Sequence, residues 1–222
     1  MMRILIATLL LLSATLAQAV APACTTISIT NGTPSNALPP ATAGASYSQT
    51  FTAIGSAATP FGYQITSGLP AGLGLSIVPS TGVLSGTPTQ AGTFFLTITG
   101  RDTNGCTGGR TYQLDVGVGD QTINFTSTAP AAASVGGPTY NVTATATSGL
   151  PVTLTIDATA AGVCSIAGST VSFTAVGTCV IDANQAGNAS FNAAPQVQQS
   201  FGVGMGAQNI TFTSTPPAKI RK

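Results

Sequence analysis

Few side chains in this sequence could carry out acid–base or nucleophilic chemistry. Histidine and glutamate are absent, and the only acidic residues are five aspartates. The side chain best suited to proton transfer near neutral pH is therefore missing, together with one of the two carboxylates that general acid–base mechanisms use. A serine or threonine hydroxyl needs a nearby base to become a nucleophile, and both lysines lie within the last four residues. The composition predicts a protein that is not an enzyme and needs no organic cofactor.

Charge is sparse and unevenly placed. Between residues 20 and 206 two arginines, Arg101 and Arg110, stand against the five aspartates, so this part has a net charge of −3. The overall formal charge of +1 depends on Arg3 and on three basic residues at the C-terminal end. Because phosphate neutralisation needs a basic face, nucleic-acid binding is not expected. With so few titrating groups, we also expect stability to vary little between about pH 5 and pH 9.

The N-terminus has the pattern of an export signal. Arg3 is followed by an apolar run over residues 4–12 and by Ala17-Gln18-Ala19, a pattern typical of signal-peptidase sites. We interpret residues 1–19 as a secretory signal peptide and expect a secreted or cell-surface protein. A short membrane anchor is the alternative, but the run is shorter than the ~20 apolar residues that span a bilayer. No later stretch is long enough to be a transmembrane segment.

Four cysteines in an exported chain predict two disulfide bonds, with three possible connectivities. The spacing favours Cys164 with Cys179, which bracket two expected strands and would face each other across neighbouring strands. Cys24 and Cys106 would then tie the first strand of their module to its last hairpin. A zinc site is the competing interpretation, although no C-x-x-C pair or histidine accompanies the cysteines.

One stretch occurs twice, at residues 121–130 (QTINFTSTAP) and 208–217 (QNITFTSTPP), offset by 87 residues and identical at seven of ten positions. A period of this size is typical of an array of modules. We therefore expect module one at residues 20–118, module two at residues 119–206, and the truncated start of a third repeat at residues 207–222. Each full module has the size of a β-sandwich.

Short segments rich in Thr, Val, Ile, Phe and Tyr alternate with Gly, Pro, Asn and Ser clusters, which predicts an all-β antiparallel sandwich for each module. In two late segments of module one, residues of one face are expected to point inward: Phe94, Leu96 and Ile98, then Tyr112, Leu114, Val116 and Val118. The expected strands cover 25–30, 46–53, 62–66, 74–78, 82–85, 93–100 and 110–118 in module one, and 122–127, 140–147, 152–156, 163–166, 170–175, 178–183 and 196–203 in module two.

An ordered set of motifs covers nearly all of module one: residues 38–51 (LPPATAGASYSQTF), 67–73 (SGLPAGL), 80–88 (STGVLSGTP) and 91–94 (AGTF). With these motifs the module resembles the bacterial immunoglobulin-like domains of secreted and cell-surface proteins, which are similar to cadherin-like sandwiches. Module two resembles them more loosely, through Ser148-Gly-Leu-Pro. The resemblance implies tandem immunoglobulin-like sandwiches with stalk, adhesion or recognition roles and no shared active site.

Some cadherin-like sandwiches bind Ca²⁺ between modules, so calcium is the one metal to consider. Asp102, Asn104 and Asp120 supply oxygen donors that we expect near the module junction, as a weak calcium site. The alternative is that residues 102–105 form a hairpin turn, in which Asn-Gly tolerates positive φ.

Three roles remain open at this stage. The first is a non-catalytic structural stalk or adhesion module, whose partners are an extracellular ligand or neighbouring immunoglobulin-like modules. The second is an accessory module, for example a carbohydrate-binding one, of a larger secreted enzyme. The third is a parallel β-solenoid, although solenoid coils repeat at ~20 residues. The loops at residues 184–195 and 68–74 are the surfaces expected to meet any ligand, although the first of them is more simply interpreted as a passive connector.

Overall fold

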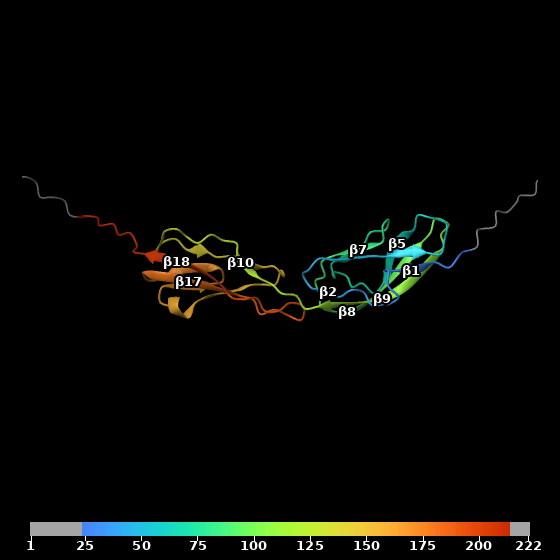
Figure 1. The fold of residues 1–222 in the computed structure, drawn as a ribbon. Coiled ribbons are helices and arrows are strands. Elements are labelled where there is room, and N and C mark those ends of the chain that lie inside the picture. The colour runs from blue at the N-terminus through green and yellow to red at the C-terminus, as the bar shows by residue number, and fades with distance from the viewer. Residues whose placement is uncertain (1–23, 214–222) are drawn as a thin grey trace, which may run out of the picture.

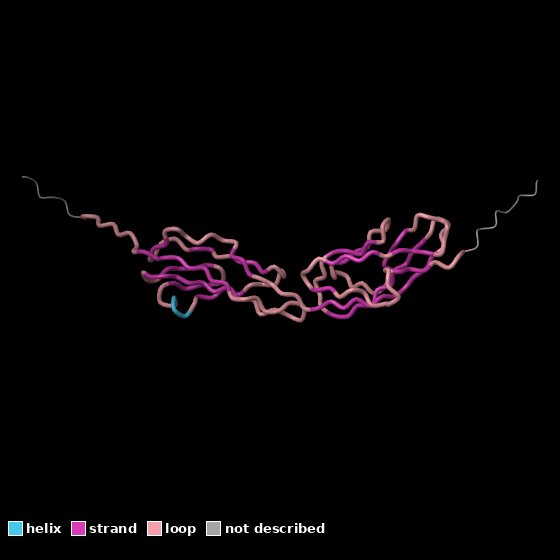
Figure 2. Tube along the Cα trace, in the orientation of Figure 1, coloured by secondary structure: helices cyan, strands magenta, loops and turns pink. Residues whose placement is uncertain are grey.

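A computed structural model describes residues 24–213. Over this range the chain forms β-strands, connecting loops and one short 3₁₀ helix (Figure 2). No helix long and apolar enough to cross a membrane occurs among these residues. The predicted signal peptide at residues 1–19 lies outside the described residues, as does the C-terminal stretch 214–222.

The strands fall into two groups that share no hydrogen-bonded sheet, and they form two lobes placed end to end (Figure 1). Module one contains β1 (Ser28–Thr30), β2 (Ala41–Thr42), β3 (Tyr47–Thr50), β4 (Thr52–Ile54), β5 (Gly62–Ser67), β6 (Leu75–Ile77), β7 (Val83–Gly86), β8 (Gly92–Arg101) and β9 (Thr107–Gly117). Module two contains β10 (Ile123–Phe125), β11 (Ala133–Ser134), β12 (Tyr140–Asn141), β13 (Ala144–Ala146), β14 (Thr153–Ile156), the 3₁₀ helix η1 (Ala158–Ala160), β15 (Cys164–Ala167), β16 (Thr170–Phe173), β17 (Gly177–Asn184) and β18 (Val197–Gly204).

The two modules have the same strand order. Module one has the sheets β2-β9-β8-β5, β3-β7-β6 and β1-β4, and module two has β11-β18-β17-β14, β12-β16-β15 and β10-β13. Every pairing between these strands is antiparallel except β2 with β9 and β11 with β18. The prediction of an all-β fold is confirmed. The β-solenoid alternative is wrong, because its coils would pair in parallel.

Period-2 alternation places the core of module one between its facing sheets. Leu96 and Ile98 of β8 and Tyr112 and Leu114 of β9 are fully buried, and their neighbours along each strand are more exposed. The expectation that Val118 also points inward is wrong, since this side chain is 47% exposed. Strand β9 ends at Gly117, so the alternation stops before Val118.

Two strands were not predicted, and both are very short. Ala41–Thr42 pairs in parallel with the last strand of module one, and Ala133–Ser134 does the same in module two. A segment of two residues is too short to show alternation, so these strands can be identified only from their hydrogen-bonded partners. The predicted third repeat forms no strand within residues 207–213, where Ile210 and Phe212 are 84% and 88% exposed.

Two core tyrosines differ in the partner of the hydroxyl group. Tyr112 donates a hydrogen bond to the carbonyl oxygen of Ile29 at 3.0 Å. The hydroxyl of Tyr47 is buried and has no hydrogen-bond partner among the described residues. Burial raises the pKa of Tyr47 from 10.0 to about 12. The folded state therefore retains the Tyr47 proton at pH values where the unfolded chain has lost it.

We expect Tyr47→Phe to leave stability unchanged or raise it by about 1 kcal/mol, because it removes an unpaired buried hydroxyl. Tyr112→Phe should instead cost about 1 kcal/mol, because it leaves the Ile29 carbonyl unpaired. A raised tyrosine pKa makes stability fall as pH rises from 10 towards 12, and Tyr47→Phe should reduce this fall. Urea unfolding of both variants at neutral and alkaline pH measures these effects. Equal losses in the two variants would contradict the assignment.

Candidate functional site at the module junction

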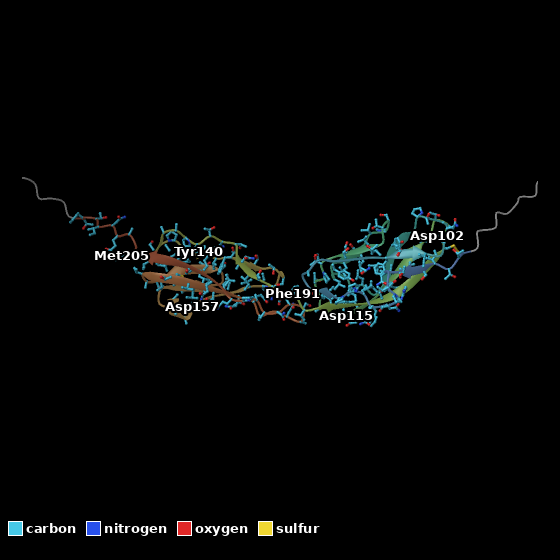
Figure 3. The ribbon with its side chains drawn as sticks, in the orientation of Figure 1. Asp102, Asp115, Tyr140, Asp157, Phe191 and Met205 are labelled. Atoms are coloured by element: carbon cyan, nitrogen blue, oxygen red, sulfur yellow. A yellow bond between two sulfur atoms is a disulfide. The ribbon has the colours of Figure 1, made fainter. Side chains whose placement is uncertain are left out.

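A long loop of module two reaches back to module one. Residues 185–195, which we name the strap, make up all but the last residue of the connection between β17 and β18, which covers 185–196. In module one the corresponding connection, between β8 and β9, covers only residues 102–106. Figure 3 shows the labelled Phe191 at the narrow region between the two lobes. The strap therefore forms part of the junction between the modules.

Phe191 is the apolar anchor of the strap. Its side chain is 7% exposed and belongs to the hydrophobic core cluster of module one, although the residue lies in module two. The ring is so close to Gly44 that a Cβ atom there would lie 3.0 Å from the Phe191 Cε1 atom. Gly44 also has a φ of +79°, which favours glycine. Leu150, on another loop of module two, packs against the same core.

Three hydrogen bonds join the strap to the backbone around the junction. The Ala91 amide donates to the Ser190 hydroxyl oxygen at 3.0 Å, and the Gly119 amide donates to the Ser190 carbonyl oxygen at 3.0 Å. The Asn192 amide in turn donates to the Gly119 carbonyl oxygen at 2.8 Å. A Cβ atom on Gly119 would lie 1.9 Å from the Ala43 carbonyl oxygen, so this close approach requires glycine.

Side chains hold the strap in the shape that presents Phe191. The Asn188 side-chain oxygen accepts hydrogen bonds from the amides of Ser190 and Phe191, at 2.8 and 2.9 Å. The Asn192 side-chain amide donates to the Asp120 carboxylate at 2.8 Å. All of these hydrogen bonds lie within the chain, so contacts within the chain hold the strap in this shape.

Gln121 supports the strap from the first residues of module two. Its side chain is 3% exposed, and its amide nitrogen donates to the Gln185 side-chain oxygen and to the Asn192 carbonyl oxygen, both at 2.7 Å. Its side-chain oxygen accepts a hydrogen bond from the Ser148 hydroxyl. Gln121 opens the repeated decapeptide, so the repeat marks a residue that anchors this loop.

The interpretation of residues 184–195 as a passive connector is wrong, because this loop contacts module one, and ligand binding by the loop stays a prediction. Ser190 and Phe191 contact module one, and Asn192 bonds to Gly119 and Asp120 at the start of module two. Sequence reasoning gave no weight to Phe191, the one large apolar residue in an otherwise small and polar loop. That contrast is the signal from which the docking could have been suspected.

The predicted calcium site is wrong in its geometry. Asp102 and Asn104 lie in the turn after Arg101, whereas Asp120 follows Gly117 at the other end of the β8–β9 hairpin. A ten-residue strand at about 3.4 Å per residue separates these ends by roughly 30 Å, so one ion cannot contact both. Among residues 24–213 no group of three or more His, Cys, Asp or Glu side chains could hold a metal ion.

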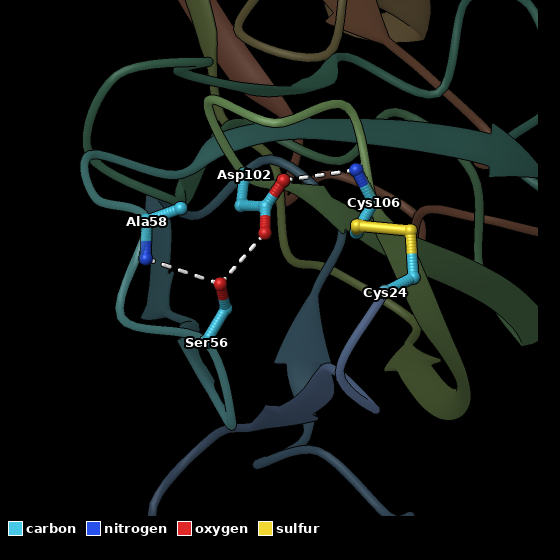
Figure 4. The surroundings of a disulfide bond; sticks show 5 residues. All are labelled: Cys24, Ser56, Ala58, Asp102 and Cys106. Carbon is cyan, nitrogen blue, oxygen red and sulfur yellow. Dashed lines mark hydrogen bonds between the residues drawn. A yellow bond between two sulfur atoms is a disulfide. The ribbon is translucent and has the colours of Figure 1, made fainter. Parts of the chain in front are cut away.

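Asp102 instead stabilises the hairpin turn. The Cys106 amide donates to one carboxylate oxygen at 2.8 Å, and the Ser56 hydroxyl donates to the other at 2.6 Å (Figure 4). The hydrogen bond from Ser56 is the main reason that the pKa of Asp102 lies below 3.8, and backbone amides of the turn lower it further. Asn104 lies in the turn, as the alternative interpretation proposed.

The pKa of Asp102 predicts acid sensitivity with a definite sign. A carboxyl group whose pKa is lowered by folding stabilises the protein above about pH 4, and this contribution is lost as pH falls through the folded-state pKa. We expect little change in stability between about pH 5 and pH 9 and a decline below pH 4. Ser56→Ala removes the main cause of the shift and should move the acid unfolding midpoint to higher pH. An unchanged midpoint in chemical unfolding against pH would contradict this assignment.

The four cysteines form two disulfide bonds in the pairing that the spacing favours. Cys24 bonds to Cys106 with a Cα–Cα distance of 5.4 Å, next to the turn of Asp102 (Figure 4). Cys164 bonds to Cys179 with a Cα–Cα distance of 5.7 Å. This second bond joins β15 to β17, which belong to the two facing sheets of module two.

Module one matches a known protein family. Residues 19–117 match the family described as "Putative Ig domain". The comparison with curated proteins finds no match.

Similar solved structures are distant. They include a "putative alpha-galactosidase/melibiase" of Bacteroides fragilis (17% identity, 40% of this chain and 17% of that chain, TM-score 0.33) and Drosophila N-cadherin EC1-3 (14%, 75% and 63%, 0.31). Protocadherin Gamma B2 domains 3-6 are also similar (13% identity, 83% of this chain and 52% of that chain, TM-score 0.36). The chain therefore spans less than two thirds of each of these structures. Identities and TM-scores at this level show neither an activity nor a partner.

Proposed function

We propose that the chain is a non-catalytic spacer or adhesion protein, and the match of residues 19–117 to the family described as "Putative Ig domain" is the premise of this proposal. In this proposal module two is a second immunoglobulin-like repeat, and the two modules form one stiff unit. The boundaries are those of the sequence repeat, with module one at residues 20–118 and module two at residues 119–206. Such a protein holds a bound or attached group at a fixed distance from the cell.

The docked strap is the observation that carries this proposal. Phe191 is buried in the core of module one, and Ser190 accepts a hydrogen bond from the Ala91 amide of that module. Ser190 and Asn192 form two more hydrogen bonds with Gly119, the first residue of module two. Neighbouring domains joined only by a short linker are expected to move relative to each other. Burial of a phenylalanine with matched hydrogen bonds opposes this motion, and it does so without a metal ion.

The composition and the disulfide bonds support a passive extracellular role. The described residues lack histidine and glutamate, so they offer few groups for catalysis. Disulfide bonds persist mainly in oxidising compartments such as the cell exterior, and both cysteine pairs are closed. We therefore propose a secreted or cell-surface protein, whose partners include neighbouring modules of the same kind.

Small-angle X-ray scattering of the full chain tests the proposal. We expect an elongated two-lobed particle whose distance distribution stays the same in excess Ca²⁺ and in EDTA. A broad ensemble of inter-module angles, or stiffening only on addition of Ca²⁺, would show that the strap does not fix the junction.

A hollow on module one favours a second candidate function, an accessory binding module. The hollow has a volume of about 380 Å³ and is lined by Tyr63, Gln64, Arg101 and neighbouring residues. The Arg101 side chain forms no salt bridge or hydrogen bond within the described residues, so its guanidinium could pair with a ligand carboxylate. Titration with a uronic-acid oligosaccharide and its neutral analogue tests this role. Selective binding of the acidic sugar that Arg101→Ala abolishes would favour it, and no binding of either sugar would remove it.

A further inference from the structure

The far end of module two has the same backbone features as the end of module one that receives the strap. In module one, Ala41–Thr42 runs parallel to β9, and the Ala43 amide donates to the Gly117 carbonyl oxygen at 3.0 Å. In module two, Ala133–Ser134 runs parallel to β18, and the Val135 amide donates to the Gly204 carbonyl oxygen at 3.1 Å. The register therefore matches Val135 to Ala43.

The two glycines next to the strap, Gly44 and Gly119, have counterparts at the equivalent positions of module two. Gly136 follows Val135 with a φ of +68°, as Gly44 follows Ala43 with a φ of +79°. Gly206 lies close to the Val135 carbonyl oxygen, where a Cβ atom would come within 2.5 Å, as Gly119 lies close to that of Ala43.

The space next to these glycines is filled in one module and open in the other. A Cβ atom on Gly44 would meet the Phe191 ring at 3.0 Å, whereas a Cβ atom on Gly136 would meet nothing within 4 Å among the described residues. Residues 207–213 do not cover this face, because every one of them is exposed. The position equivalent to that of the Phe191 ring is therefore unfilled in the described part of the chain.

The hydrogen-bonding groups that hold the strap recur as well. Ala91 and Gly119, whose amides donate to Ser190, correspond to Val176 and Gly206. Within residues 24–213 neither the Val176 amide nor the Gly206 amide donates a hydrogen bond. Val176 is 56% exposed. Figure 1 shows that this end of β18 lies far from module one, so the strap of module two cannot reach it.

We propose that this face, formed by Val135, Gly136, Val176 and Gly206, binds the aromatic loop of a following module of the same kind. The inference rests on the proposed function, a tandem array. The second copy of the decapeptide supports this occupant, because Gln208 stands 87 residues after Gln121, the residue that anchors the strap. The loop to be bound has the chemistry of residues 190–192, a phenylalanine between a serine and an asparagine.

A three-module protein tests this proposal. Residues 1–206 are followed directly by a second copy of residues 120–206, which reproduces the register of the first junction. Hydrogen exchange is then measured at the amides of Ala91 and Gly119 and at those of Val176 and Gly206. In the native chain we expect fast exchange at Val176 and Gly206, and in the three-module protein about tenfold slower exchange or more. The matched control replaces by alanine the phenylalanine of the appended copy that corresponds to Phe191, and it should restore fast exchange.

The outcomes separate this inference from the function on which it rests. Protected Ala91 and Gly119 amides with unprotected Val176 and Gly206 amides would overturn the inference and leave the stiff first junction standing. Fast exchange at all four amides would overturn the proposed function itself. Protection of Val176 and Gly206 that appears in the native chain only at high concentration, together with dimer formation, would show that a second copy binds this face and would also overturn the inference.

Discussion

Phe191→Ala is expected to uncouple the two modules. Truncation of a buried phenylalanine to alanine costs about 3 to 5 kcal/mol, and Phe191 is buried in a core that belongs to the other module. We expect the loss at the lower end, about 3 kcal/mol, because the ring lies at the edge of that core. The loss should appear as a lower unfolding midpoint of module one and as a wider spread of inter-module angles in scattering.

Val118→Ala is the matched control. Val118 is the last residue of module one and is 47% exposed, so its truncation should change stability by no more than about 0.5 kcal/mol. It should also leave the scattering profile as it is. If Phe191→Ala behaved like this control in calorimetry and in scattering, the strap would have no role in fixing the junction.

Removal of the Cys24–Cys106 bond is expected to be the most destabilising change in module one. The bond closes an interval of 82 residues, and loop-closure entropy for an interval of this length corresponds to about 4.5 kcal/mol. The cysteines also lie beside the Asp102 turn, so the hairpin end would loosen when the N-terminal segment is released. Chemical unfolding of the double variant C24A/C106A measures the loss.

The bond of module two provides the comparison. It closes an interval of 15 residues, for which the same estimate is about 3 kcal/mol. C164A/C179A should therefore cost less than C24A/C106A, and each pair should mainly affect its own module. A larger loss in module two would show that the cross-link between its sheets matters more than the length of the closed interval.

Much of the architecture could be predicted from local sequence patterns. The alternation around Leu96 and Tyr112 predicted strands that are observed, because a strand buries every second residue whatever its partner is. The pairing favoured by the cysteine spacing is the one in the structure, since Cys164 and Cys179 lie close in sequence and within one module. Val118 marks the limit of this reasoning, because alternation cannot show where hydrogen bonding to the next strand stops.

The junction was decided by tertiary structure alone. The resemblance to cadherin-like sandwiches suggested Asp102 and Asp120 as ligands of one calcium ion, but a long hairpin places them at opposite ends of module one. The strap shows no alternation, and its role depends on Phe191 reaching Gly44 of the other module. The sequence by itself determined the strands and the scarcity of chemistry, because these depend on residue types and their local order. The docking of one module on the next depends on contacts between residues about 100 to 150 positions apart, and local order does not encode such contacts.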